Sequence, residues 1–446
     1  MPLRTLLRTS AATRALPLVL GFVLVALADD LTAWVTPAYG LSAAGHASFA
    51  LPFVCAACAA TGAWEGARLH RGRVFDRSPV RSPLAITAPV LLPVAVLGGL
   101  GMAAALGTAA LAGGTASGVP QPGVLAVWAG LLLANALVGS IVGRVLAPVV
   151  AVPLALVGSF VLNAYPASFD AFWLRHLVGG GLSDCCAVDQ VLDGRAVWSS
   201  LAFSGAVCAA AALVIRYRGA AAASALALAV TAGGIALAGS LAQGLGPAPV
   251  RARPAADLVC DDGRPRICLW PELGGTRSGL VREEARRVVG QLAEHGVPAP
   301  AALTMAAEPG PGEAKLGVPT TARPQDVAPG VVSGLLPAAP ACARRGEPYP
   351  AGAAAGPVTA WLTAQAAPGP AGAATGTAPG VAAPPESGRF GEQDLALAEQ
   401  VLRLPREAQL DWYRRTAESL RHCATDPADR QGLQGPHGTQ SPGGAG

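Results

Sequence analysis

The chain has 446 residues, of which 52% are hydrophobic and only 13% are charged. Soluble domains carry about 25% charged residues, so the composition indicates a membrane protein. The net charge of +4 is small, and no basic stripe with interleaved aromatic residues is present, which argues against nucleic acid as a partner. Apolar stretches fill residues 15–241, whereas most charged residues follow residue 250. The sequence therefore predicts a membrane domain in the lipid bilayer, residues 1–246, followed by a polar domain.

Seven segments are apolar enough to cross a bilayer, which takes about 20 residues in a helix. They lie near residues 15–35, 47–67, 84–111, 123–143, 145–164, 197–215 and 219–241. The first is the shortest, because its apolar core ends at Ala28. Ala26-Leu27-Ala28 also resembles a signal-peptidase site behind a positively charged leader, so a cleaved signal peptide is an alternative to a first span.

Arginine residues are segregated to alternate connections between these segments. With the N-terminus in the cytoplasm, the cytoplasmic pieces carry Arg4, Arg8, Arg14, Arg68, Arg71, Arg73, Arg77, Arg81, Arg144, Arg216 and Arg218. The charged external loops carry only two arginines, Arg175 and Arg195, beside six aspartates. The positive-inside rule then predicts a multi-pass plasma-membrane protein with seven crossings, a cytoplasmic N-terminus and an extracytoplasmic C-terminal domain.

The spans contain few polar groups, of which Asn135 and Asn163 are the most notable. Hydrogen bonds between helices explain them, and no Asp/Glu/His relay suited to proton-coupled transport is present. Prolines and small residues are frequent within the spans. They are compatible with a closely packed bundle and, alternatively, with the hinged helices of a transporter.

The connection 64–83 is the most informative cytoplasmic piece. It carries Glu65 and the arginines Arg68, Arg71, Arg73, Arg77 and Arg81. These charges have two interpretations. They hold the connection in the cytoplasm, or they dock a cytoplasmic partner protein.

The chemistry expected of the cysteines depends on which side of the membrane they occupy. The external loop 165–196 has adjacent Cys185 and Cys186 near His176, but their spacing matches no zinc pattern, so we expect no metal or cofactor. The two cysteines are expected to pair either with other external cysteines or with each other. In an oxidising compartment, Cys260 and Cys268 are expected to bond across a hairpin. Cys342 and Cys423 are expected to form a second disulfide. The motif "CAAC" at Cys55–Cys58 lies within an apolar span and is read as coincidence.

The second domain, residues 247–423, is predicted to be a small α/β unit. A helix follows Ser278, with Val281, Ala285, Val288, Val289 and Leu292 on its apolar face and Gly296 at its end. Residues 298–330 and 351–388 are rich in Ala, Pro and Gly and are expected to be irregular insertions, with a strand in 331–338. Two helices follow in 389–404 and 405–423. The tail 424–446 is expected to be disordered. The predicted fold is thus a polytopic α-helical bundle of about seven helices, a small α/β domain and a disordered tail.

Motifs of catalysis are missing from the sequence. It has no G-x-S-x-G, H-E-x-x-H, S-x-x-K or phosphate-binding loop, so the chain is not expected to be an enzyme or to hydrolyse ATP by itself.

The layout resembles that of the ABC-2-type permease-like proteins of high-GC bacteria. The resemblance rests on "LLRTSAATRALPLVLGF", on "AATGAWEGARLHRGRVFDRSPVRSP" between the second and third spans, and on the bundle that follows. "ICLWPE" and "LPREAQLDWYRRTAESLRHC" resemble an uncharacterised external domain fused to such proteins. The resemblance implies the permease subunit of an export or resistance system. A separate ATPase would contact the loop of Arg68 to Arg81, and the subunit would work as a homo- or heterodimer. The seventh span and the external domain depart from that family. A non-transporting accessory or sensor protein is the alternative function, and a membrane-anchored hydrolase is a weaker third.

Overall fold

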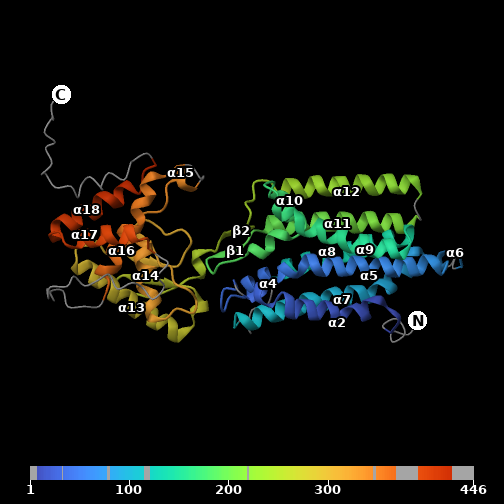
Figure 1. The fold of residues 1–446 in the computed structure, drawn as a ribbon, viewed down its shortest axis with the longest axis horizontal. Helices are drawn as coiled ribbons and strands as arrows, with labels where there is room; N and C mark the ends of the chain where they lie inside the picture. Colours follow the sequence, from blue (N-terminus) through green and yellow to red (C-terminus); the bar gives the residue numbers. More distant parts are fainter. Residues whose placement is uncertain are drawn as a thin grey trace, which may run out of the picture. The chain divides into compact units, whose positions relative to one another are not determined.

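The chain folds into two compact units, Met1–Arg253 and Pro254–Gly446 (Figure 1). The structure, a computed structural model, describes residues 8–32, 34–77, 81–114, 121–217, 220–344, 348–367 and 390–423. The predicted tail 424–446 lies outside the described residues. The first unit extends seven residues beyond the expected boundary at 246, because strand β2 (Val250–Ala252) pairs with β1 (Gln190–Leu192) and stays with the bundle.

The first unit is a helical membrane bundle. Six helical segments among the described residues are long and apolar enough to span a membrane: Gly40–Arg71, Pro83–Ala112, Pro122–Val145, Pro148–Ser168, Gly194–Arg216 and Ala221–Ala242. A shorter apolar helix, Ala11–Ala26, occupies the first predicted segment. The predicted bundle of about seven apolar helices is therefore confirmed, with a short first member.

The helices of this unit are, in chain order, α2 (Ala11–Gly21), a π-turn (Phe22–Ala26), α3 (Ala28–Thr32), α4 (Gly40–Ala47), a 3-10 turn (Ser48–Ala50), α5 (Leu51–Arg71), α6 (Val74–Arg77), α7 (Pro83–Ala112), α8 (Pro122–Val145), α9 (Pro148–Ala164), α10 (Trp173–Leu177), α11 (Gly194–Arg216) and α12 (Ala221–Ala242). Two further 3-10 turns, Tyr165–Ser168 and Gly180–Asp184, flank α10. Helix formation pairs the backbone polar groups of the helix interior within the same segment, which the bilayer interior requires.

The central packing interface joins α5 and α8 through small residues. A Cβ atom on Gly62 or Gly66 would lie under 3.0 Å from a backbone oxygen of α8. A Cβ atom on Gly139 or Gly143 would lie equally close to a backbone oxygen of α5. Both helices thus carry a small-xxx-small pattern, which lets two backbones approach in a membrane where apolar burial gives little drive to associate.

The two ends of the bundle differ in charge. We call one the arginine end: here Arg68 donates to the carbonyl of Thr9 at 2.8 Å, and Arg144 donates to the hydroxyl of Thr87 at 2.6 Å. We call the opposite end the ribbon end, because the β1–β2 ribbon lies there (Figure 1). At the ribbon end Tyr39 donates its hydroxyl to the carbonyl of Gln190 at 2.6 Å.

The second unit contains a four-stranded mixed sheet in the order β3-β4-β5-β6. The strands are β3 (Val259–Cys260), β4 (Arg266–Leu269), β5 (Ala302–Thr304) and β6 (Glu313–Lys315). β3 pairs antiparallel with β4, whereas β5 is parallel to both β4 and β6. Helix α13 (Gly275–Glu294) connects β4 to β5, as parallel strands require a crossover. Short 3-10 turns lie at Ala255–Asp257 and Pro271–Leu273.

The predicted apolar face of α13 is confirmed, because Val281, Ala285, Val288, Val289 and Leu292 are all buried. The prediction that this helix begins after Ser278 was wrong. The helix begins one turn earlier at Gly275, and the Ser278 hydroxyl donates to the Gly275 carbonyl at 2.8 Å.

The remaining helices are α14 (Pro324–Gly334), α15 (Ala341–Arg344), α16 (Ala355–Gln365), α17 (Glu392–Leu402) and α18 (Arg406–Ser419), with a 3-10 turn at Pro350–Ala354. The expectation of irregular chain in 298–330 and 351–388 was wrong for the part that the structure describes, which holds β5, β6, most of α14 and α16. The predicted strand in 331–338 is also wrong, since α14 extends to Gly334. Burial decides these elements: Val327, Val331, Val332 and Trp361 pack into the core despite the Ala/Pro/Gly-rich composition.

Candidate functional sites

Glu65 lies inside the bundle, although it neighbours the arginine-rich connection in the sequence. The residue is 1% exposed. Its carboxylate accepts hydrogen bonds from the Ser10 hydroxyl at 3.1 Å, the Ala11 amide at 2.8 Å and the Arg68 guanidinium at 3.0 Å. A carboxylate in this place satisfies free amides and the positive dipole end at the start of α2. Glu65 therefore joins α2 to α5 and does not belong to an exposed docking surface.

The arginines of this connection are placed differently. Arg71, the last residue of α5, is exposed, as are Arg73 and Arg81, and the side chain of Arg68 is 44% exposed. The guanidinium of Arg71 lies 5.9 Å from the centre of the Trp64 ring. The side chain of Arg77 lies outside the described residues. The exposed members leave several cationic groups on the surface of the arginine end.

An apolar cavity of about 730 Å³ lies within the membrane-spanning region, lined by α8, α9, α10, α11 and α12. Its polar lining residues are Ser224, Thr231 and a pair of asparagines that joins α8 to α9. Asn163 donates to the amide oxygen of Asn135 at 3.3 Å, and Ser159 donates to the same oxygen at 2.7 Å. The predicted interhelical hydrogen bonds are therefore present, and both asparagines also line the cavity.

A second cavity, of about 540 Å³, lies at the ribbon end, and we call it the ribbon-end cavity. It is more polar than the first and combines carboxylates, aromatic rings, a histidine and a cysteine pair. Its lining residues are Asp30, Trp34, Thr36, His46, Phe49, Ser183, Asp184, Cys185, Cys186, Ala187 and Gln190. Sequence reasoning missed Asp30, Trp34, His46 and Phe49 as members of one site, because only the fold brings them to the loop of Cys185.

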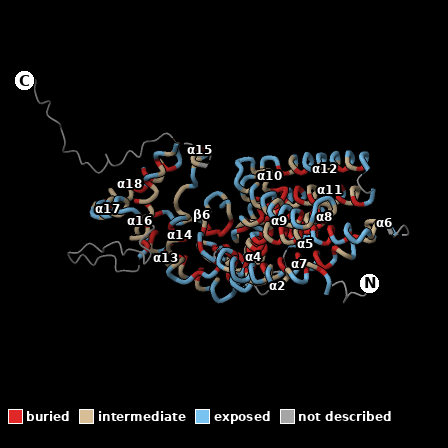
Figure 2. Tube along the Cα trace, turned by 45° about the vertical axis from the view of Figure 1, so that its right-hand side comes forward, coloured by how far each residue is buried: buried red, intermediate tan, exposed pale blue. Residues whose placement is uncertain are grey.

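Cys185 and Cys186 form a disulfide with each other at one wall of this cavity. Both are buried, and Thr36 donates its hydroxyl to the carbonyl of Cys186 at 3.3 Å. A Cβ atom on Gly45 would lie under 3.0 Å from the Cys185 carbonyl, so α4 packs directly on this wall. Figure 2 shows α4 as a largely buried segment. The Thr36 hydrogen bond and the packing of α4 thus both hold this wall in place.

The two histidines at this end have separate environments. Nδ1 of His46 lies 2.9 Å from the carbonyl of Ser42, and because a carbonyl only accepts, Nδ1 carries the proton. The ring of His46 lines the ribbon-end cavity. His176 instead lies buried, with Nε2 2.9 Å from the carbonyl of Gly246, and burial lowers the pKa of its ring. The described residues contain no cluster of three or more His, Cys, Asp or Glu side chains arranged to hold a metal ion.

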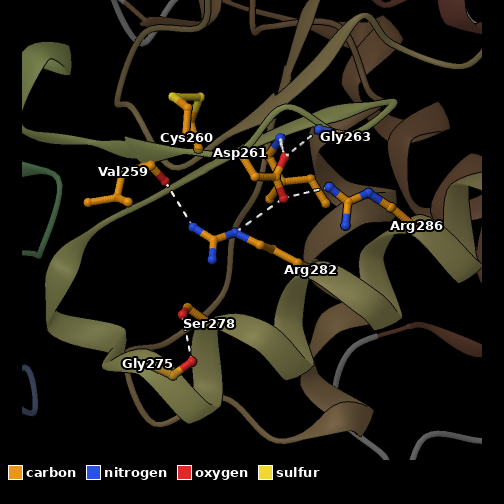
Figure 3. Close-up of polar contacts among 10 residues, drawn as sticks. Val259, Cys260, Asp261, Gly263, Gly275, Ser278, Arg282 and Arg286 are labelled. Atoms are coloured by element: carbon orange, nitrogen blue, oxygen red, sulfur yellow. Dashed lines mark hydrogen bonds and ion pairs between the residues drawn. A yellow bond between two sulfur atoms is a disulfide. The ribbon is translucent and has the colours of Figure 1, made fainter.

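In the second unit, Asp261 is the centre of the polar contacts drawn in Figure 3. One carboxylate oxygen accepts from the amides of Ile267 at 3.0 Å and Gly263 at 3.2 Å. The other faces the guanidinium groups of Arg286 at 2.5 Å and Arg282 at 3.3 Å. Partial burial by itself would raise the pKa of Asp261, but these hydrogen bonds and the positive charge of Arg286 together lower it. These contacts join the β3–β4 turn to α13, which indicates a structural role for Asp261.

Two disulfides join cysteines of the second unit. Cys260 bonds to Cys268, its cross-strand partner between β3 and β4, and Cys342 bonds to Cys423 across 81 positions. These are the pairs that the sequence predicts. Cys55 and Cys58 are buried free thiols within α5.

Comparison with known proteins identifies one region of the chain. Residues 267–423 match the model of a family described as a domain of unknown function, DUF7224. The match begins within β4 and ends at Cys423, so it covers most of the second unit. No curated protein and no solved structure matches the chain. The chain is thus a multi-span helical membrane protein that carries a C-terminal DUF7224 domain.

Proposed function

We propose that this protein is a permease-like subunit of an ABC-type export or resistance system, which handles apolar or amphipathic compounds and depends on a separately encoded ATPase. The observation that carries the proposal is the cavity of about 730 Å³ among α8 to α12. Its lining is almost wholly apolar, with Asn135 and Asn163 as polar anchors. Ligand sites combine this kind of apolar lining with a few placed polar groups.

The charge distribution supports an orientation for this subunit. Arg68, Arg71, Arg81 and Arg144 lie at the arginine end, whereas the aspartates of the external loops lie at the ribbon end. Under the positive-inside rule, the arginine end is cytoplasmic. The second unit, which follows β2 at the ribbon end, is then extracytoplasmic.

The exposed arginines supply the docking surface for the ATPase. Arg71 is the last residue of α5 and Arg73 lies two residues further on, at the end of the most deeply buried of the spanning segments. A partner bound there would act on the helix that contacts α2, α7, α8 and α9. Exposed charges of this kind steer association and fix register more than they add affinity. Energy must come from such a partner, because the sequence has no phosphate-binding loop.

The test is co-purification from the native membrane with the double variant Arg71→Gln/Arg73→Gln. We expect the parent to retain an ATPase subunit and the double variant to lose most of it at physiological salt. Arg216→Gln is the matched control, since Arg216 is an exposed arginine at the end of another helix. Membrane insertion is measured separately by protease accessibility. If no ATPase accompanies the parent, or if the double variant retains as much as the control, the permease proposal fails.

A second candidate function is that of a non-transporting accessory or sensor protein. It is favoured by the ribbon-end cavity, which is more polar than the apolar cavity and lies at the end opposite the arginines. The same experiment separates the two functions, because a sensor of this type requires no ATPase at Arg71 and Arg73.

A further inference from the structure

We propose that the ribbon-end cavity binds a small organic cation, with an ammonium group as the recognised feature. This site shares no residue with the apolar cavity or with the arginine surface, so it stands independently of the permease proposal. Four properties of the cavity carry the inference: its charge, its aromatic rings, its size and the way its wall is held.

The charge of the lining is negative. Asp30 and Asp184 are its carboxylates, and the lining contains no arginine or lysine. Arg175 reaches Asp184 at 3.2 Å from outside the lining and neutralises part of that charge. Asp30, the other carboxylate of the lining, has no ion-pair partner among the described residues. A carboxylate at a concave surface, facing low-dielectric walls, attracts a cation more strongly than it would in open water.

The aromatic rings select an organic cation over a metal ion. Trp34 and Phe49 line the cavity, and their side chains are 79% and 43% exposed. Large exposed rings at a concave site attract alkylammonium groups through the negative face of the ring. A bare divalent ion would instead need several oxygen ligands, and no cluster of three or more acidic, histidine or cysteine side chains is present in the described residues.

The size and the wall of the cavity point to a built site. About 540 Å³ falls within the range of small-molecule pockets. One wall of the cavity is the Cys185–Cys186 disulfide, held by the Thr36 hydrogen bond and by the close approach of Gly45 in α4. Gln190 is held by the Tyr39 hydroxyl through its carbonyl. A wall that is fixed before binding loses little entropy when the ligand arrives.

The experiment uses the full-length chain in lipid nanodiscs and isothermal titration with choline. Its neutral isostere, 3,3-dimethylbutan-1-ol, has the same shape without the charge. We expect saturable choline binding and at least tenfold weaker binding of the isostere. Asp30→Asn should weaken choline binding about tenfold, as expected for one lost charge contact at partial exposure. Asp29→Asn is the matched control, because Asp29 is the exposed neighbour that does not line the cavity. Trp34→Leu should also weaken binding.

Three results would overturn the inference. They are the absence of saturable choline binding at millimolar concentrations, isostere binding as tight as that of choline, and equal effects of Asp29→Asn and Asp30→Asn. The isostere comparison needs no variant, so the test holds even if a substitution disturbs folding. Loss of ATPase co-purification alone would leave this inference standing, which keeps the two proposals distinguishable.

Discussion

The small-residue interface between α5 and α8 leads to a graded prediction for three glycine-to-alanine variants. In Gly139→Ala, the new Cβ would lie under 3.0 Å from the backbone oxygen, carbon and Cα of Ala59. Backbone atoms cannot rotate away, so the helices must separate by roughly 1 Å to reach ordinary contact. In Gly98→Ala, the Cβ meets the side chains of Cys58 at 2.8 Å and Leu132 at 3.2 Å, which can adjust. In Gly107→Ala, it meets nothing within 4 Å.

The expected magnitudes follow from this geometry. Overpacking of a well-packed interface costs about 1–3 kcal/mol, and a gap of 0.5–1 Å also forfeits a quarter to a half of each neighbouring dispersion contact. All three variants share the gain in helix propensity, which is at most about 1 kcal/mol. We therefore expect Gly139→Ala to unfold about 2–3 kcal/mol more easily than Gly107→Ala, with Gly98→Ala between them.

The assay is unfolding of the purified protein in mixed micelles by increasing SDS, followed by tryptophan fluorescence. The comparison among the three variants removes the contribution of propensity, because each replaces one helical glycine by alanine. Equal midpoints for Gly139→Ala and Gly107→Ala would refute the close backbone contact. A midpoint of Gly98→Ala below that of Gly139→Ala would refute the distinction between backbone and side-chain neighbours.

Four further predictions address topology, processing, disulfides and pH. Reporter fusions after residues 80, 180 and 260 should read cytoplasmic, external and external, and a cytoplasmic reading at 260 would contradict the proposed orientation. Intact-mass measurement should find the first segment retained, since cleavage after Ala28 would remove Ser10 and Ala11 and leave the buried Glu65 carboxylate without two of its donors; a mature chain starting at Asp29 would contradict this. Non-reducing peptide mapping should find the disulfides Cys260–Cys268 and Cys342–Cys423, whereas free thiols at these positions would count against both. The second disulfide should add about 4 kcal/mol to the free energy of unfolding by restricting the unfolded chain. The folded pKa of Asp261 lies below its ordinary value of 3.8, so its contribution to the free energy of unfolding is complete above pH 3.8 and is lost as the pH falls through the lower folded pKa. Asp261→Asn should lower the free energy of unfolding by about 1–3 kcal/mol at pH 7 and weaken its dependence on pH in the acid range. An unchanged pH dependence in that range would refute the role of this carboxylate.

The spanning helices were predictable because the bilayer demands long apolar segments, and composition alone reveals them. The face of α13 was predictable for a similar reason, since its apolar residues recur at helical spacing. α14 and α16 escaped prediction because their proline and glycine content resembles that of loops, while their helical state depends on tertiary burial of residues such as Val331 and Trp361.

The candidate sites were less predictable than the fold. The sequence predicts Glu65 as a surface charge because arginines follow it. Its hydrogen bond with Ser10, 55 positions away in the sequence, forms only in the folded bundle and shows that Glu65 is internal. The ribbon-end cavity likewise combines Asp30 and His46 with Cys185, residues that no local motif connects. Sequence spacing carries no signal for such a site, because the distances that define it arise from helix packing.

The ribbon of β1 and β2 has a mechanical consequence for the chain that follows it. The segment after α12 is hydrogen-bonded along Val250–Ala252 to Gln190–Leu192 before it enters the second unit. A force that pulls on the second unit therefore acts on the hydrogen bonds of the ribbon before it reaches α12. Strand β1 of the ribbon continues the loop that carries Gln190, Ala187 and Cys186, three residues of the ribbon-end cavity. The same short stretch of backbone therefore pairs with β2 and lines the ribbon-end cavity.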